Sequence, residues 1–394
     1  RRPTLSDDAA LAKCYTSVLD KALEYNARTV AFPCISTGIF GYPKARAARV
    51  AVDAISKWMM DARTTTSGAC PFVLLVAYTD DDEKGLAKAL DIHKSLLDEI
   101  ATEKLDDLAM QAAKAVKDAD AVLVTSGAGL SASAGIDYTS EEIHRKYFPD
   151  MAKRGYRCMY QYIGGAPKDP SVLWGYLCRQ VKEVRFGTSM ITNNTYDLLR
   201  GVVGEKKHYC VTSNADGLIH RLGHFDPKMV VERQGTYGLL QCLEPTCDSS
   251  PWASEPELDR LREGLLVDGR TSAAAPCCPR CGSNSVFLNV RGGSWFDESP
   301  RRESERGLQS FLKSLDKNES KLVIIEIGAG YNTPGVIRGP NERYTGMFKK
   351  STLIRVSMDH AHAPANITDR CVLAPEDAHK FLDAMTKAMG KLNS

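Results

Sequence analysis

A strand-like apolar run that leads directly into closely spaced glycines constrains this chain more than any other feature. Residues 121–124 read Ala-Val-Leu-Val and have the length and composition of a buried strand. Gly127-Ala-Gly-Leu-Ser-Ala132 follows and fits a pattern in which glycines let the backbone approach a pyrophosphate at a helix N-terminus. The same pattern is also typical of a tight strand–helix turn without a ligand. It predicts an α/β domain and leaves the ligand open.

A simple dehydrogenase fits the following residues poorly. Such an enzyme carries an acidic residue about 20 residues after the glycines, at the end of a second strand. Residues 151–157 are instead basic and have no strand character. A later strand, which begins at His208, ends in a segment where Asn214 and Asp216 alternate, so their side chains can face the same side. A turn formed by Asn-Ala-Asp-Gly is the alternative interpretation.

Four of the twelve cysteines have the spacing of a metal site. Cys242 and Cys247 form one short-range pair, and Cys278 and Cys281 form the other. Four thiolates close a tetrahedral zinc site with no open position, which is typical of a structural ion, one per chain. Cys277 is an alternative to Cys278, but Cys278-Pro-Arg-Cys281 followed by glycine is the usual zinc-ribbon pattern. Twelve cysteines in 394 residues are too sparse for a disulfide scaffold, and a thiolate cluster suits a reducing, intracellular compartment.

Together these motifs resemble a sirtuin from about Leu105 to the end of the chain. Gly-Ala-Gly-x-Ser, Thr-x-Asn-x-Asp-Gly, the cysteine pairs and a second glycine turn, Gly328-Ala-Gly-Tyr-Asn-Thr-Pro334, occur in the sirtuin order. Asp137-Tyr-Thr139 and Gln234-Gly235 stand where class M sirtuins have the same residues. The resemblance implies a Rossmann-type α/β domain over 105–394, with a small zinc-ribbon and helical subdomain whose zinc module covers about 235–290.

The resemblance also implies NAD as co-substrate and assigns residues to its site. Asn214 would sit under the ribose and nicotinamide, and Asp216 would help to hold the nicotinamide region. Asp137 would lie near the same end, with helix capping as the alternative. The expected NAD-binding residues are Ser126, Gly127, Ala128, Gly129, Ser131, Gly135, Ile136, Asp137, Asn214, Asp216, Gly328, Ala329, Gly330, Asn332, Thr333 and Ser357.

Gln234 decides between the activities found in this family. Sirtuin deacylases have a histidine here that acts as a base on a ribose hydroxyl, and a carboxamide has no proton to exchange near neutral pH. A positioned general base contributes about 10²–10⁴-fold in rate, so deacylation should be crippled. Expulsion of nicotinamide needs no base at this position. Class M sirtuins carry this glutamine and are protein ADP-ribosyltransferases, which is the predicted activity; a deacylase or a non-catalytic NAD or ADP-ribose binder are the alternatives.

Arg291 completes the expected catalytic set with Asn214 and Gln234. It matches an Asn-x-Arg of class M sirtuins that supplies an active-site arginine. A guanidinium is permanently charged and can bind a phosphate or carboxylate in two directions, so Arg291 could hold the acceptor or the ribose. A surface salt bridge is the alternative. The acceptor that the family implies is a lipoylated carrier protein of the glycine-cleavage type.

The first hundred residues alternate helices and short strands, which predicts a parallel αβα sheet. The expected elements include a helix from Asp7 to Asn26 capped by Ser6, and separate helices from Asp81 and from Glu103, with the domain boundary near 95–104. Ile35-Ser-Thr-Gly-Ile-Phe-Gly41 resembles the diphosphate loop of macrodomains, which bind ADP-ribose. The loop residues expected to contact the ligand are Ser36, Thr37, Gly38, Ile39 and Phe40.

Only about the C-terminal half of a macrodomain is expected in residues 1–100, because the family's first half has no counterpart after Arg1. An open sheet edge and a start that is missing or processed are therefore expected. The formal net charge of +2 gives no reason to expect nucleic acid as a partner, and apolar runs are far shorter than a membrane span. These observations do not distinguish cytoplasm from mitochondrial matrix.

Overall fold

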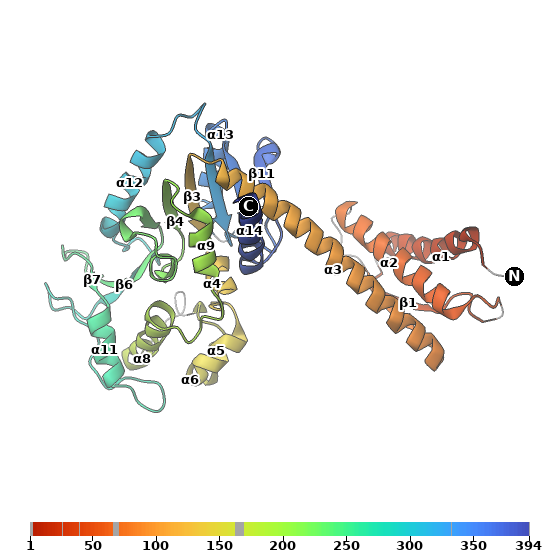
Figure 1. Ribbon diagram of the computed structural model, residues 1–394. Coiled ribbons are helices and arrows are strands. Elements are labelled where there is room, and N and C mark those ends of the chain that lie inside the picture. The colour runs from red at the N-terminus through yellow and green to blue at the C-terminus, as the bar shows by residue number, and fades with distance from the viewer. Residues whose placement is uncertain are drawn as a thin grey trace. The chain divides into compact units, whose positions relative to one another are not determined.

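The computed structural model describes residues 3–25, 27–38, 40–65, 71–161, 169–331 and 333–393 (Figure 1). The chain divides into two compact units, Arg1–Lys104 and Leu105–Ser394. The boundary lies inside α3, and each unit is described by itself.

The first unit contains a short parallel sheet and amphipathic helices. Its elements are α1 (Leu5–Glu24), β1 (Thr29–Pro33), α2 (Lys44–Thr65), β2 (Phe72–Val76) and α3 (Asp80–Lys117). The two strands pair in parallel from Thr29↔Phe72 to Pro33↔Val76. Buried side chains of α1, β1 and α2, with Tyr15 against Phe32 at 5.1 Å between ring centroids, form its core.

Two expectations for this unit are wrong. Thr4, and not Ser6, is the N-cap of α1, because Thr4 and Asp7 form a reciprocal capping box. One helix, α3, also replaces the two helices expected to begin at Asp81 and Glu103. Its 38 residues contain no proline and only one glycine, Gly85, so nothing in the local sequence ends the first helix before the second begins.

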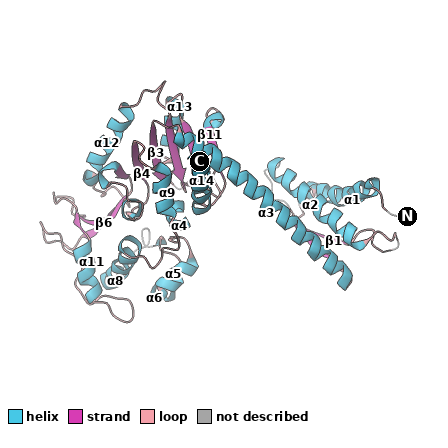
Figure 2. Cartoon of the chain, viewed as in Figure 1, coloured by secondary structure: helices cyan, strands magenta, loops and turns pink. Residues whose placement is uncertain are grey.

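The second unit is built on a parallel sheet covered by helices on both faces (Figure 2). Its elements up to the small module are β3 (Ala121–Ser126), α4 (Ala128–Ser133), α5 (Glu141–Tyr147), α6 (Pro149–Lys153), α8 (Pro170–Val181), η1 (Lys182–Phe186), α9 (Thr195–Val203), β4 (His208–Thr212), α10 (Leu218–Arg221), η2 (Pro227–Met229) and β5 (Val230–Glu232). The elements after the small module are η3 (Ser299–Arg301), α12 (Arg302–Lys313), β9 (Leu322–Ile327), α13 (Arg338–Met347), β10 (Thr352–Val356), η4 (Thr368–Arg370), β11 (Cys371–Ala374) and α14 (Ala378–Asn393).

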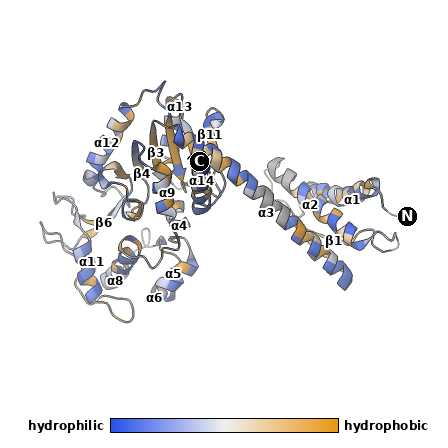
Figure 3. Ribbon diagram, viewed as in Figure 1, coloured by the Kyte–Doolittle hydropathy of each residue, from blue (hydrophilic) through white to orange (hydrophobic). Residues whose placement is uncertain are grey.

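The strand order β11-β10-β9-β3-β4-β5 confirms the predicted Rossmann-type fold class. Counted from β3, it is the 3-2-1-4-5-6 order of doubly wound dinucleotide-binding sheets, and all described pairs in it are parallel. Every residue of β3 and β9 is buried, and these central strands are apolar in Figure 3. In such sheets the ligand lies at the carboxyl ends of the strands where the order reverses, here β3 and β9.

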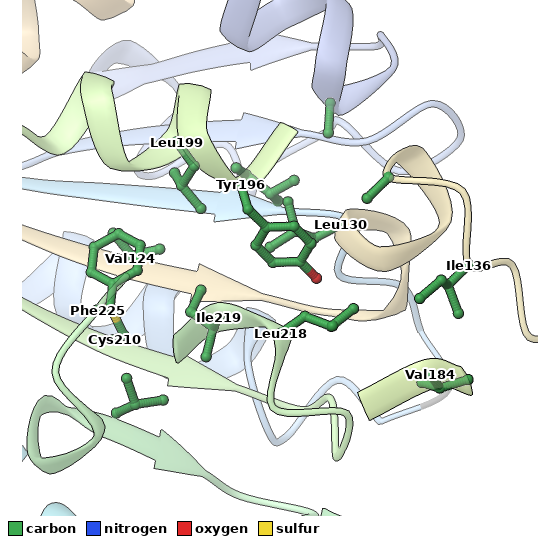
Figure 4. Close-up of a cluster of buried hydrophobic side chains, with 14 of the residues drawn as sticks. Val124, Leu130, Ile136, Val184, Tyr196, Leu199, Cys210, Leu218, Ile219 and Phe225 are labelled. Carbon is green, nitrogen blue, oxygen red and sulfur yellow. The ribbon is translucent and has the colours of Figure 1, made fainter. Parts of the chain in front are cut away.

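Side chains of β3 point alternately to two separate cores. Val122 and Val124 belong to a large cluster with α9 and α14, whereas Ala121 and Leu123 belong to a cluster with α12. Figure 4 shows the first cluster near the strand ends, where Leu130 and Tyr196 lie close to Leu218.

Strand β9 carries one buried charge in its apolar run. Glu326 is 1% exposed and accepts hydrogen bonds from Arg355 Nε at 2.7 Å and Asn341 Nδ2 at 2.8 Å. Arg338 Nη1 lies 3.6 Å from the same carboxylate. The carboxylate is therefore fully paired, as a buried charge must be.

A small module is inserted between β5 and α12. It contains β6 (Gly235–Cys242), β7 (Trp252–Ala253), α11 (Glu255–Glu263) and β8 (Val286–Val290). The three strands form an antiparallel sheet in the order β7-β6-β8. Among the described residues, no helix is both long enough and apolar enough to cross a membrane.

Candidate functional site

The two glycine turns meet at the carboxyl ends of β3 and β9. Gly127 N–H donates to Ile327 O at 2.9 Å, and Gly129 N–H donates to Gly328 O at 3.1 Å. A Cβ on Gly129 would lie 2.5 Å from Gly328 Cα, and a Cβ on Gly127 would lie 2.6 Å from Gly328 O. Gly328 itself has a φ of +62°. These three positions require glycine because the backbones of the two turns are in direct contact.

A buried cluster links the first turn to the end of β4. Asn214 Nδ2 donates to Gly127 O and to Ser131 Oγ, both at 3.0 Å. Ser131 Oγ in turn donates to Asp216 Oδ2 at 2.6 Å, while Asp216 Oδ1 accepts from Leu218 N–H at 3.0 Å. The structure thus brings together Gly127, Ser131, Asn214 and Asp216, as expected of residues around one ligand.

Three tyrosines surround this cluster and were not expected from the sequence. Tyr138 Oη lies 3.4 Å from Asp216 Oδ2, and Tyr196 Oη lies 3.1 Å from Ser131 Oγ. Burial raises the pKa of Tyr138, Tyr196 and Tyr237 above the ordinary phenol value, and burial likewise raises the pKa of the Asp216 carboxyl. Tyr138 and Tyr237 lie within the sequence motifs, so their position next to the site could have been predicted. Tyr196 lies outside any motif and could not.

Gln234 follows β5 and has a buried carboxamide oxygen. Its Oε1 is buried and has no hydrogen-bond partner among the described residues. Its backbone carbonyl accepts a hydrogen bond from Arg291 N–H at 2.9 Å. Gly235 has a φ of +83°, and a Cβ there would lie 2.1 Å from Asn289 O, so the turn after Gln234 requires glycine. A carboxamide oxygen can accept a hydrogen bond, and this one has no protein donor among the described residues.

Arg291 lies at the end of β8, next to Gln234 in space. Its guanidinium pairs with Glu298 and lies over the Phe296 ring at 4.9 Å from the centroid. The side chain of Arg291 is 43% exposed. The salt-bridge alternative is therefore what the structure contains, and Glu298 accepts from one of the five N–H donors of the guanidinium.

A pocket of about 590 Å³ lies between the sheet and the small module. Gly217, next to Asp216, and Gly235, next to Gln234, both line it. His220 Nε2 lies 3.3 Å from Glu232 Oε1 in its wall, and both residues line the pocket, as does Arg185. These wall residues were not expected from the sequence, because they come from η1, α10 and β5. The pocket is large enough for a substrate side chain.

The second turn and its neighbours form the other side of the strand ends. Ala329 is buried, and its carbonyl accepts from Arg338 Nη1 at 3.2 Å. The nearest atom to a Cβ on Gly330 would be His360 Cδ2 at 3.7 Å. Thr333 is exposed, and Asn332 lies outside the described residues. Ser357 Oγ accepts from His360 N–H at 3.3 Å.

The remaining predicted residues of the first turn have structural partners. Ser126 Oγ donates to Thr212 Oγ1 at 2.9 Å, and Ile136 is fully buried. A Cβ on Gly135, whose φ is +110°, would lie 2.3 Å from Met190 O. Asp137 Oδ1 accepts from Thr139 N–H at 2.8 Å, and Ala128 is exposed.

The four predicted cysteines form one cluster. The sulfur atoms of Cys242, Cys247, Cys278 and Cys281 all lie within 4.8 Å of one another, and two of the distances, 242–281 and 247–278, are 3.7 Å. Zn–S bonds of about 2.3 Å in a tetrahedron give S···S edges of about 3.8 Å, so the arrangement fits zinc. Cys277 is exposed and is not part of the cluster, which settles the alternative in favour of Cys278.

The loop of the first unit, residues 35–41, lines none of the described pockets. Ser36 has a φ of +68°, which is unusual outside glycine, and Thr37 Oγ1 donates to Cys34 O at 2.9 Å. Gly38 O accepts from Gly41 N–H, Phe40 is 87% exposed, and Ile39 lies outside the described residues. The described cavity of this unit measures only about 10 Å³ and is not lined by the loop.

Comparisons with known proteins match the first unit to a family and the chain to named relatives. Residues 2–51 match the Macro domain family. A protein of Fusarium oxysporum f. sp. cubense named probable bifunctional ADP-ribose hydrolase/ADP-ribosyltransferase is 33% identical over 378 residues, which cover 90% of this chain and 60% of that protein. The chain thus spans about 60% of the length of that relative.

Two further matches cover the second part of the chain. A protein ADP-ribosyltransferase of Staphylococcus aureus is 24% identical over 271 residues, covering 67% of this chain and 82% of that protein. A crystal structure of a Sir2 homolog–NAD complex matches with a TM-score of 0.46 and 16% identity, covering 72% of this chain and 94% of that one.

Proposed function

We propose that this chain, a macrodomain segment joined to a sirtuin-type unit, is a NAD-dependent protein ADP-ribosyltransferase. The observation that carries the proposal is Gln234, a carboxamide whose buried oxygen has no partner among the described residues and which the resemblance places at the ribose. A carboxamide accepts a hydrogen bond from a ribose hydroxyl but cannot remove its proton. The names of the two sequence relatives support the same activity.

In this proposal NAD binds across the two glycine turns, with its nicotinamide end at Asn214 and Asp216. Asn214 is held by Gly127 and Ser131, so its orientation is set before the ligand arrives. The bond between ribose C1′ and nicotinamide breaks with its electron pair on nicotinamide. A nucleophilic atom of the acceptor then forms the new bond to C1′, entering from the pocket that Gly217 and Gly235 line.

The acceptor is proposed to be a lipoylated carrier protein, as the family resemblance implies. Arg291 would hold the acceptor or the ribose through a charge-assisted hydrogen bond. The macrodomain segment would bind ADP-ribose at Ser36–Phe40 once the domain is complete, so that writing the modification and reading or removing it are linked. Zinc, when bound by the four cysteines, would stabilise the small module that forms one wall of the pocket.

The test is incubation with NAD labelled in its adenosine half, together with the lipoylated or the unlipoylated carrier. We expect label on the lipoylated carrier and release of one nicotinamide per label. The Asn214→Ala variant should lose transfer and keep its zinc content and melting temperature. If neither carrier is labelled while acetyl-lysine peptides are turned over with nicotinamide release, the protein is a deacylase.

A further inference from the structure

Five charged side chains form a continuous chain of ion pairs beside the pocket. Glu305 Oε1 lies 3.1 Å from Arg233 Nε and 3.0 Å from Arg301 Nη1. Arg301 Nη2 lies 2.7 Å from Glu298 Oε1, and the same oxygen accepts a hydrogen bond from Arg291 Nη2. Each carboxylate therefore joins two guanidinium groups, and the charges alternate from Arg233 to Arg291.

Both ends of this ion-pair chain lie at Gln234. Arg233 directly precedes it, and Arg233 N–H donates to Thr212 O at 2.9 Å. Arg291 N–H donates to Gln234 O, also at 2.9 Å. Arg233 Nη1 in addition donates to Val336 O at 2.8 Å, after the second glycine turn. The ion-pair chain and the backbone of Gln234 thus form a closed ring. Arg233 joins this ring to β4 and to the segment after the second glycine turn.

Burial differs between the two ends of the ion-pair chain. The side chains of Arg233, Arg301 and Glu305 are 18%, 19% and 22% exposed, so the inner pairs are shielded from water. Glu298 and Arg291 are 47% and 43% exposed. Exposed ion pairs contribute little to folding stability. The outer link can therefore be removed with little loss of stability, so its effect on the orientation of Arg291 can be measured separately.

We infer that the ion-pair chain sets the orientation of the Arg291 guanidinium and that Glu298 is its positioning residue. The inference rests on the proposed function, in which Arg291 contacts the acceptor or the ribose. Glu298 occupies one N–H donor on Nη2, and the other four remain for a carboxylate or phosphate. Arg301 holds Glu298 from the other side. Arg301 and its neighbours Phe296 and Asp297 line the pocket, so the acceptor meets a wall ordered by these pairs.

The test is a double-mutant cycle on Glu298 and Arg291, with labelled NAD and the lipoylated carrier as substrates. The Glu298→Gln variant should lower kcat/KM for transfer about tenfold. This loss is larger than the loss of an exposed ion pair alone would cause and smaller than the loss caused by a misplaced catalytic group. The dissociation constant of NAD should not change. Glu298→Asp should restore part of the rate. In an Arg291→Gln background, Glu298→Gln should cost nothing further, because it acts through Arg291.

A matched control is Glu257→Gln, which removes an ion pair of similar exposure with Arg260 at 2.7 Å in the small module, outside the ion-pair chain. This variant should leave transfer unchanged. Full activity in Glu298→Gln, or losses that add in the double variant, would overturn the inference and leave the proposed function intact. If the wild-type protein labels neither form of the carrier, the proposed function fails, and this inference fails with it.

Discussion

Replacement of Gly129 by alanine should destabilise the second unit, although the same change favours a helix. Gly129 lies in α4, where alanine has the better helix propensity by about 1 kcal/mol. The new Cβ would lie 2.5 Å from Gly328 Cα and 3.1 Å from Gly328 O. Both atoms belong to backbone that cannot rotate away. Overpacking of this kind costs about 1–3 kcal/mol, and a local shift of the turn would also disturb the NAD site.

The assay is thermal unfolding followed by circular dichroism, with NAD binding measured by calorimetry. We expect the melting temperature to fall by roughly 2–6 °C and NAD affinity to fall with it. Gly346→Ala is the matched control. Gly346 lies in α13 with no atom within 4 Å of its added Cβ, so this variant should gain about 0.5–1 kcal/mol. If Gly129→Ala is as stable as Gly346→Ala, the reasoning about contact between the turns is refuted.

Three further changes test other parts of the site. Removal of the metal with a chelator should unfold the module of β6, β7 and β8, because one ion bound by the four sulfurs would hold these segments together. Near-ultraviolet circular dichroism would follow the unfolding, and the zinc-to-protein ratio before chelation should be near one. Gln234→His should raise turnover of acetyl-lysine peptides, by up to about 10²-fold if the base alone is lacking, and unchanged turnover would show that it is not. Burial raises the pKa of Asp216, so this carboxyl stabilises the fold below its ordinary pKa of 3.8 and the contribution is lost as pH rises through the raised value. Urea unfolding at a series of pH values above 3.8 measures this loss. The stability of Asp216→Asn should fall less with rising pH than that of the wild type, and equal slopes would contradict the shift.

The sequence was sufficient where function depends on short motifs next to strand ends. An apolar run followed by glycines located β3 and its turn, and the alternation of Asn214 with Asp216 placed two polar groups on one side of the β4 end. Cysteine spacing identified the four thiols that cluster in space. These features are local, so the residues that define them are neighbours along the chain.

Features that depend on contacts between distant segments were not predictable. Gly129 and Gly328 contact each other only once the sheet order brings β3 beside β9. Tyr196 reaches Ser131 from a helix with no motif of its own. The partner of Arg291 could not be chosen from several nearby acidic residues without the path of the loop. At the N-terminus, Ser6 and Thr4 are both good caps, and only the reciprocal bond with Asp7 decides between them.

The buried carboxylate of Glu326 has a consequence for how the sheet assembles. Its neighbours in β9 are all aliphatic, so they would tolerate sliding of the strand by one position with little loss of apolar burial. Sliding would turn the carboxylate to the opposite face, away from Arg355 and Arg338, and leave a charge without a partner in a dry interior. We therefore expect misaligned β9 to be rejected early in folding, so that Gly328 reaches the first glycine turn in a single alignment.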